Sequence, residues 1–90
     1  MEDRGALRPY LEPILVEVGC YSGYRANERP VWFVLAGERK KVVSIVDRWY
    51  GVEHDYFKVS VDDGKVYMLK WHRQLDLWYL VSEGKRLGEH

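Results

Sequence analysis

Short apolar segments, rich in β-branched and aromatic residues, follow one another after residue 13, and polar segments, most of which contain glycine, separate them. The alternating or β-branched segments are residues 14–18, 31–35, 42–49, 56–61, 66–71 and 77–81. A period of two residues is typical of half-buried β-strands, and no helical stripe longer than a turn or two is present. The pattern therefore predicts an all-β single domain of five or six antiparallel strands in a meander. So many strands in 90 residues indicate a strongly twisted sheet or a small barrel.

The segment around Gly64 predicts a hairpin with one favoured register. A two-residue loop mixes apolar and polar side chains on both faces of this hairpin, whereas a three-residue loop, 62–64, separates them. With the three-residue loop, Val59 lies opposite Tyr67. A slip of one residue moves every side chain to the other face, so the register with the cleaner separation is favoured. It requires a type I turn followed by Gly64 with a positive φ.

The same register assigns the side chains of the hairpin to two faces. The inward face is expected to carry Phe57, Val59, Val61, Tyr67, Leu69 and Trp71. The outward face is expected to carry Tyr56, Lys58, Ser60, Val66, Met68 and Lys70. Adjacent strand residues point to opposite sides, so either Trp78 or Tyr79 joins the outward face.

The remaining segments predict the domain boundaries and the loops. Residues 1–13 are rich in charge and proline and are expected to form a flexible N-terminal lead-in, followed by the domain at 14–82 and a polar tail at 83–90. Residues 19–30 are polar and predict a long loop. A hairpin is expected across 31–49, and its turn stays open between a type II′ turn on Gly37 and longer loops.

Composition and charge exclude several classes of protein. Aromatic residues make up 14% of the chain, which favours a stable small core without a disulfide or a metal. Cys20 is the one cysteine and cannot form an internal disulfide. No segment has the features of a signal peptide or a membrane span, so a cytoplasmic protein without membrane contact is expected. A formal net charge of zero weighs against a large binding surface for duplex nucleic acid.

Candidate chemistry is weak throughout the chain. Possible metal ligands gather in and near one predicted loop, namely Asp47, Glu53, His54 and Asp55. They lack a diagnostic spacing, so a solvated loop is the favoured interpretation. His72 has no paired nucleophile or carboxylate in a recognisable motif, and nothing adjacent to Cys20 would activate its thiol. The sequence therefore predicts no catalytic residue, no metal and no cofactor.

Basic residues interleaved with aromatic residues are the best indication of function. They occur in the segments 48–50 and 70–73. Positive charge beside aromatic rings is typical of surfaces that bind single-stranded nucleic acid. With a neutral net charge, however, the favoured interpretation is that the aromatics form the core and the lysines a solvated face. The favoured hypothesis is a non-catalytic binding module that docks a partner protein through an aromatic sheet face. The alternative is a weak single-stranded nucleic-acid-binding accessory domain. The expected contact residues are Arg48, Tyr56, Lys58, Met68, Lys70 and Arg73.

A family resemblance is carried by a series of short motifs across residues 12–82. These motifs are Arg29-Pro30-Val31-Trp32-Phe33, Gly37, Val46-Asp47-Arg48-Trp49, Tyr56-Phe57-Lys58-Val59, Tyr67-Met68-Leu69 and Trp78-Tyr79-Leu80. In this order they resemble a small bacterial domain family of unknown function. Its members occur alone or at the C-terminal end of proteins similar to Y-family (translesion) DNA polymerases. The resemblance implies an accessory role near DNA, in DNA repair, and supplies no catalytic residues.

Overall fold

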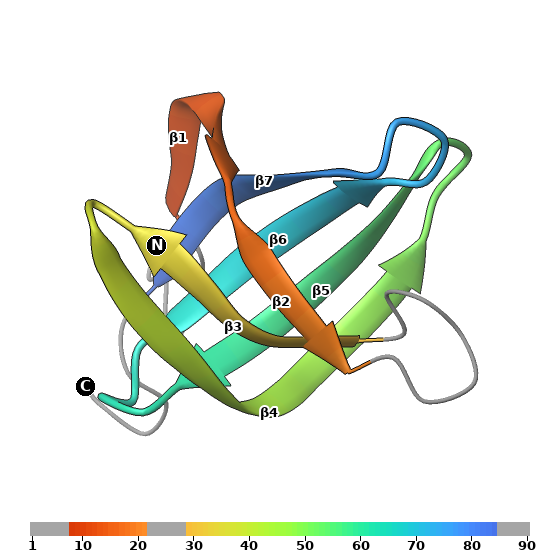
Figure 1. The fold of residues 1–90 in the computed structure, drawn as a ribbon. Coiled ribbons are helices and arrows are strands. Elements are labelled where there is room, and N and C mark those ends of the chain that lie inside the picture. The colour runs from red at the N-terminus through yellow and green to blue at the C-terminus, as the bar shows by residue number, and fades with distance from the viewer. Residues whose placement is uncertain (1–7, 22–28, 85–90) are drawn as a thin grey trace, which may run out of the picture.

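The computed structural model describes residues 8–21 and 29–84, which form one sheet of seven antiparallel strands. The strands are β1 (Arg8–Val16), β2 (Val18–Tyr21), β3 (Arg29–Leu35), β4 (Glu38–Tyr50), β5 (His54–Val61), β6 (Val66–His72) and β7 (Leu77–Gly84). Their order in the sheet is β1-β7-β6-β5-β4-β3-β2. Figure 1 shows the sheet curled into a half-barrel, with β2 and β3 crossing over the face formed by β5, β6 and β7. The predicted all-β meander is confirmed, but the strands number seven rather than five or six.

The additional strand arises because the predicted strand at 14–18 is divided at Glu17 into β1 and β2, and both parts extend into segments that were expected to be irregular. β1 begins at Arg8, inside the expected lead-in, and β2 occupies the start of the expected 19–30 loop. The parts of these segments at 1–7 and 22–28 lie outside the described residues. Prolines made residues 8–13 look unlike a strand, but β1 is at an edge of the sheet, where an unpaired backbone position is tolerated. Its pairing with β7 is accordingly irregular between Pro9 and Ile14.

Strand pairing is interrupted at Glu17, where the chain passes from one edge of the sheet to the other. β1 pairs with β7 as far as Val16, and β2 pairs with β3 from Val18 onward. The carbonyl of Glu17 accepts a hydrogen bond of 3.0 Å from the amide of Val34. The segment formed by β1 and β2 therefore pairs with β7 on one side and with β3 on the other, and this arrangement curls the sheet.

The two central hairpins have short loops whose backbone angles agree with their sequences. In the β5–β6 hairpin Val59 lies opposite Tyr67, and Gly64 has a φ of 90°, so the predicted register is confirmed. The Gly64 amide donates to the Val61 carbonyl over 2.8 Å, which closes the predicted turn. The β3–β4 hairpin has a two-residue loop on Ala36 and Gly37, with φ angles of 53° and 81°. Positive φ at both positions identifies a type I′ turn rather than the type II′ turn that was considered.

Strand β4 bends because it contains two β-bulges. Its pairing with β5 shifts register around Val43 and again around Val46, and these two residues are 56% and 38% exposed. Between them Ile45 still packs against the core. A bulge inserts an extra residue and increases the local twist. The bulges therefore let β4 pair with β3 through its first residues and with β5 through the rest.

The core fills the concave side of the sheet. The inward residues predicted for the β5–β6 hairpin are buried, except that Trp71 is only partly buried. Phe33 from β3 meets Tyr67 edge to face, with ring centres 5.2 Å apart. Trp78 lies in the core, so Tyr79 is the residue of that pair that joins the outer face. At one end of the core Trp78 stacks on Trp71 at 5.8 Å.

Two positions on the outward face are buried, contrary to the simple alternation. Ser60 and Val66 are only 6% and 2% exposed. They lie opposite each other, and the Ser60 hydroxyl shares a hydrogen bond of 2.7 Å with the Ser44 hydroxyl. Both side chains are short, and they lie next to the longer side chains of Lys58 and Met68 in the two strands.

Candidate functional site

The outer face of the sheet carries one continuous row of large side chains. Successive cross-strand pairs place Trp49 beside Tyr56, Tyr56 beside Lys70, Lys70 beside Tyr79, and Tyr79 beside Leu15. We call these five residues the outer row. Its two ends are well exposed, since Trp49 is 43% and Leu15 is 60% accessible, while the three middle residues are half-buried. The row crosses five of the seven strands.

A second, more polar row lies next to the outer row. Asp47 pairs with Lys58, and Lys58 pairs with Met68. Within the outer row, the Lys70 ammonium lies 5.5 Å from the centre of the Tyr79 ring. A cation at this distance from an aromatic face is attracted to the ring. The face therefore combines aromatic surface with two lysines and one aspartate.

The structure brings together four of the six contact residues expected from the sequence. Tyr56, Lys58, Met68 and Lys70 all lie on the outer face, on adjacent strands. Arg48 does not lie there, because it pairs with the inward residue Phe57.

Arg48 covers the edge of the core instead. Its guanidinium carbon lies 4.7 Å from the centre of the Phe57 ring and 5.1 Å from that of Tyr50. Its Nε is buried and has no hydrogen-bond acceptor among residues 8–21 and 29–84. The two bulges in β4 each add one residue, so together they restore the alternation, and Arg48 points inward like Val42 six positions before it.

The Arg73 side chain links the β6–β7 loop to the β4–β5 connection through hydrogen bonds. Its Nη1 donates to Asp55 Oδ1 at 2.5 Å, and its Nη2 donates to the carbonyls of Gly51, at 2.9 Å, and of Val52. Its own amide donates to the Glu53 carbonyl at 3.1 Å. The Arg73 guanidinium thus has an intramolecular role at the base of the 51–53 connection.

Three residues of the outer row were not among the expected contacts, namely Leu15, Trp49 and Tyr79. Tyr79 was one of two candidates for the outer face, and alternation alone could not choose between it and Trp78. Trp49 lies seven positions after the inward residue Val42, so a period of two counted from Val42 would have placed it on the outer face. Leu15 joins the row only because β1 pairs with β7, a long-range contact.

Two histidines extend the outer face beyond Tyr56 and Lys70. His54 pairs with His72, and their rings meet edge to face with centres 4.8 Å apart. Burial lowers the pKa of His54, and the nearby positive charge of Lys70 lowers that pKa further. His72 Nδ1 accepts a hydrogen bond of 3.1 Å from the Leu75 amide.

The acidic residues near these histidines point in different directions. Glu53 Oε1 lies 3.9 Å from His72 Nε2, whereas Asp55 is turned to the inner side and held by Arg73. Over the described ranges, 8–21 and 29–84, no three His, Cys, Asp or Glu side chains are close enough together to hold a metal ion.

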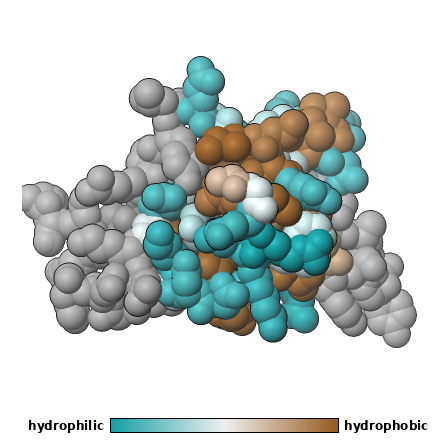
Figure 2. Space-filling view, turned by 60° about the vertical axis from the view of Figure 1, so that its left-hand side comes forward, coloured by the Kyte–Doolittle hydropathy of each residue, from teal (hydrophilic) through white to brown (hydrophobic). Residues whose placement is uncertain are grey.

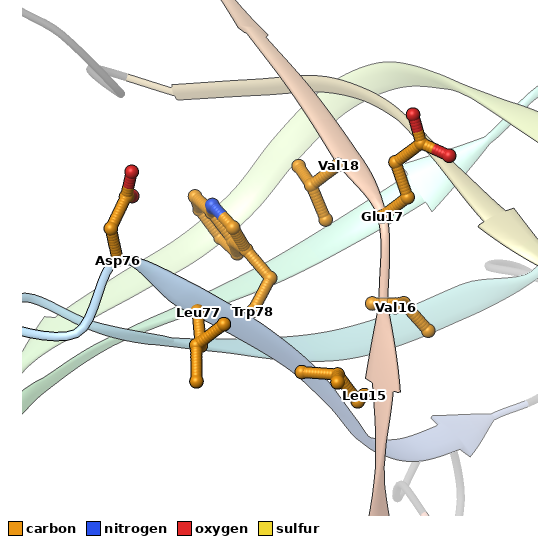
Figure 3. Close-up of a pocket in the computed structure, with 7 residues that line it drawn as sticks. All are labelled: Leu15, Val16, Glu17, Val18, Asp76, Leu77 and Trp78. Carbon is orange, nitrogen blue, oxygen red and sulfur yellow. The ribbon is translucent and has the colours of Figure 1, made fainter.

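A groove opens where β1 leaves β7 (Figure 3). It has a volume of about 450 Å³. Its apolar lining includes Leu15, Val18, Leu77 and Trp78, and two carboxylates, Glu17 and Asp76, stand at its sides. Leu15 belongs both to this groove and to the outer row. The groove therefore continues the exposed apolar surface of the outer row around the edge of the sheet.

Cys20 is half-buried against the core, near Asp76. Burial raises the pKa of its thiol to about 11, and the negative charge of Asp76 adds to this effect. The thiol is protonated at neutral pH, and a protonated thiol is a poor nucleophile.

Apolar surface is unevenly distributed over the molecule. In Figure 2 hydrophobic side chains gather over the upper part of the visible face, above a band of hydrophilic ones. The part of the chain that the structure describes contains no helix long and apolar enough to cross a membrane.

Comparisons of the chain with protein-family models, with curated proteins and with solved structures found no match. The resemblance to the bacterial domain family stays a prediction from the sequence.

Proposed function

We propose that the protein is a non-catalytic binding module that docks onto a partner protein through the outer row. The observation that supports this is the unbroken series of cross-strand pairs from Trp49 to Leu15, with an exposed apolar residue at each end. Contiguous apolar surface with charge at its rim is typical of protein contact sites. Tryptophan and tyrosine are also the residues that most often carry the binding energy of such sites.

The distribution of charge favours a protein over a nucleic acid as the partner. Lys58 lies opposite the carboxylate of Asp47 on the neighbouring strand. Lys70, by contrast, lies between Tyr56 and Tyr79 and has no carboxylate among its cross-strand partners. The two arginines expected to contribute are occupied elsewhere: Arg48 covers the core, and Arg73 holds Asp55. Binding of phosphates usually requires several convergent cations.

The test compares capture of partners by surface variants of equal solubility. Trp49→Ser removes an exposed anchor of the outer row, and Val52→Ser removes an equally apolar but separate side chain that is 94% exposed. Each immobilised protein is incubated with lysate of the source cells after nuclease treatment. We expect a partner that is retained by the unchanged protein and by Val52→Ser but is lost with Trp49→Ser. Equal retention by both variants would contradict the proposal.

A second candidate is weak binding of single-stranded nucleic acid by the same face. It is favoured by Lys70, which lies over the Tyr79 ring and beside Tyr56. Aromatic platforms next to a cation hold unstacked bases at about 1–3 kcal/mol per base. The resemblance to a domain found beside Y-family polymerases agrees with this candidate.

Titration with a fifteen-residue oligothymidylate, followed by tryptophan fluorescence, separates the two candidates. Nucleic-acid binding should weaken steeply as salt is raised and should be lost in Lys70→Glu. Docking of a protein through aromatic anchors should change little with salt and should be lost in Trp49→Ser. The absence of any fluorescence change with the oligonucleotide at low salt would exclude the second candidate.

A further inference from the structure

We propose that the Arg48 guanidinium binds a carboxylate group of an acidic ligand near the end of β4, beside the β4–β5 connection (Figure 1). Arg48 pairs with the inward residue Phe57, so this site lies on the inner side of the sheet. The outer row lies on the opposite side. The proposal therefore goes beyond docking through the outer row and does not depend on it.

The Arg48 guanidinium has lost part of its contact with water. Its carbon lies 4.7 Å from the centre of the Phe57 ring, which is completely buried, and 5.1 Å from the centre of the Tyr50 ring. Its Nε is buried but finds no acceptor in the part of the chain that the structure describes. A cation that loses hydration without gaining a partner is costly to keep in place. An anion bound at this guanidinium would offset part of that cost.

The far edge of the same guanidinium, formed by Nη1 and Nη2, is available to a ligand. Within residues 8–21 and 29–84 these two atoms make no hydrogen bond and no ion pair, and unlike Nε they are not buried. The two N–H groups along such an edge match the spacing of the two oxygens of a carboxylate. Charge-assisted pairs of this kind are stronger than hydrogen bonds between neutral groups.

The two carboxylates in the adjoining parts of β4 and β5 are held by other groups. Asp47 precedes Arg48 but points to the outer face, opposite Lys58, and its Oδ1 accepts a hydrogen bond of 2.9 Å from the Arg48 amide. Asp55 is the one carboxylate of β5, and Arg73 binds it. Over the described ranges, the positive charge of Arg48 is therefore left without a counter-ion.

The surroundings of the site favour a carboxylate over a phosphate group. A carboxylate carries one negative charge, which one guanidinium matches, whereas phosphate groups usually require several convergent cations. The other arginine at this end, Arg73, is bound to Asp55 and to the carbonyls of Gly51 and Val52. The Tyr50 ring is 70% exposed and offers apolar surface beside the guanidinium. An acid with an aromatic body therefore fits the site better than a free ion does.

The test uses probes that share one aromatic ring and differ in the group attached to it. The protein is labelled with ¹⁵N and titrated at constant ionic strength with benzoate, benzamide, benzamidinium and phenyl phosphate. We expect benzoate to shift the side-chain Nε–H signal of Arg48 and the amide signals of Tyr50 and Phe57, with a Kd on the order of 10 mM. Benzamide should bind several-fold more weakly, and benzamidinium should leave these signals unchanged. Phenyl phosphate should bind less than about tenfold more tightly than benzoate, because no second cation matches its second charge.

Two substitutions of Arg48 separate its charge from its shape, with the Tyr50 and Phe57 amide signals as the readout. Arg48→Lys keeps the positive charge and an aliphatic stem but lacks the planar pair of N–H groups, so it should weaken benzoate binding about threefold. Arg48→Met also removes the charge and should abolish binding.

The matched control is Arg39, whose guanidinium also lies over an aromatic ring, 3.9 Å from the centre of Trp32, but whose side chain is exposed. Because exposed ion pairs contribute little, Arg39→Met should bind benzoate as the unchanged protein does.

Three results would overturn the proposal. One is an equal response to benzoate and benzamide, which would reduce the site to an apolar surface. Another is binding of phenyl phosphate tenfold or more tighter than that of benzoate, which would assign the site to phosphate groups. The third is unaltered benzoate binding in the Arg48 variants that show an intact fold in their spectra. Should Arg48→Met fail to fold, Arg48→Lys and the comparison of benzoate with benzamide still decide. None of these readouts involves Trp49, so the outcome is independent of docking through the outer row.

Discussion

Arg73 and Asp55 form an ion pair in which the carboxylate is only 4% exposed and the guanidinium remains partly accessible. The same guanidinium also binds the Gly51 and Val52 carbonyls, so one side chain connects the β6–β7 loop with the β4–β5 connection. A buried carboxylate without such a partner would be strongly destabilising. The pair therefore fixes the end of the half-barrel at which the two histidines and Tyr50 are located.

Removal of either partner should destabilise the fold. We expect Arg73→Met to lower the free energy of unfolding by about 3 kcal/mol, because it leaves Asp55 buried without its counter-charge. Urea denaturation followed by tryptophan fluorescence measures the change. Lys65→Met, on an exposed turn, is the control and should change stability by less than about 0.5 kcal/mol. A loss in Arg73→Met no larger than that of the control would show that the pair contributes little.

The turn at Ala36 offers a change of the opposite sign. Ala36 has a φ of 53°, a conformation that costs a residue with a Cβ roughly 1 kcal/mol relative to glycine. Ala36→Gly should therefore raise the free energy of unfolding by about 0.5–1 kcal/mol, after allowance for the greater freedom of glycine in the unfolded chain. Ala36→Val should lower it, because β-branched residues resist positive φ. Thermal melts of the three proteins should rank glycine, alanine and valine from most to least stable.

The sequence was sufficient for the β5–β6 hairpin because local signals agree there. Gly64 supplies the positive φ, and two clean faces select one register. The signals conflict in β4, where Val43 and Val46 belong to an apolar run but are exposed at bulges. A pattern with a period of two cannot locate a bulge, so counting from Val42 it assigns Ser44 and Ile45 to the wrong faces, and it returns to phase only after the second bulge.

The candidate site was predictable only in part, for the same physical reason. Tyr56, Lys58, Met68 and Lys70 lie on one hairpin, where alternation assigns them together. Leu15 reaches the outer row, and Glu17 and Asp76 reach the groove, through the pairing of β1 with β7 and its end at Val16. Such contacts connect residues more than sixty positions apart, and no local pattern encodes them.

Gly19 is expected to tolerate no side chain. A Cβ at this position would lie 2.1 Å from the ring of Trp32, its cross-strand partner. The Arg39 guanidinium lies 3.9 Å from the centre of that ring, so a movement of the ring would also disturb this contact. Gly19→Ala should therefore cost about 1–3 kcal/mol of stability through overpacking.

A double-mutant cycle checks this cause. Gly19→Ala should cost much less in a Trp32→Leu background than in the unchanged protein, because the smaller side chain leaves space for the methyl group. Urea denaturation of the four proteins gives the coupling energy. Equal costs of Gly19→Ala in both backgrounds would mean that the backbone of β2, rather than the Trp32 ring, excludes a side chain.

Stability should fall on the alkaline side because two buried groups resist ionisation. Burial raises the pKa of Cys20 from 9.0 to about 11, and burial also raises the pKa of Tyr67 above its usual value of 10.0. Both groups ionise more easily in the unfolded chain. Their contribution to stability is therefore complete below about pH 9 and is lost as the pH rises toward the folded pKa values. For Cys20, which is only half-buried, the loss should be on the order of 1 kcal/mol.

Chemical denaturation at intervals between pH 8 and pH 11 should show this decline, with a shallower slope in Cys20→Ala and in Tyr67→Phe. Parallel slopes in all three proteins would assign the alkaline loss to other groups.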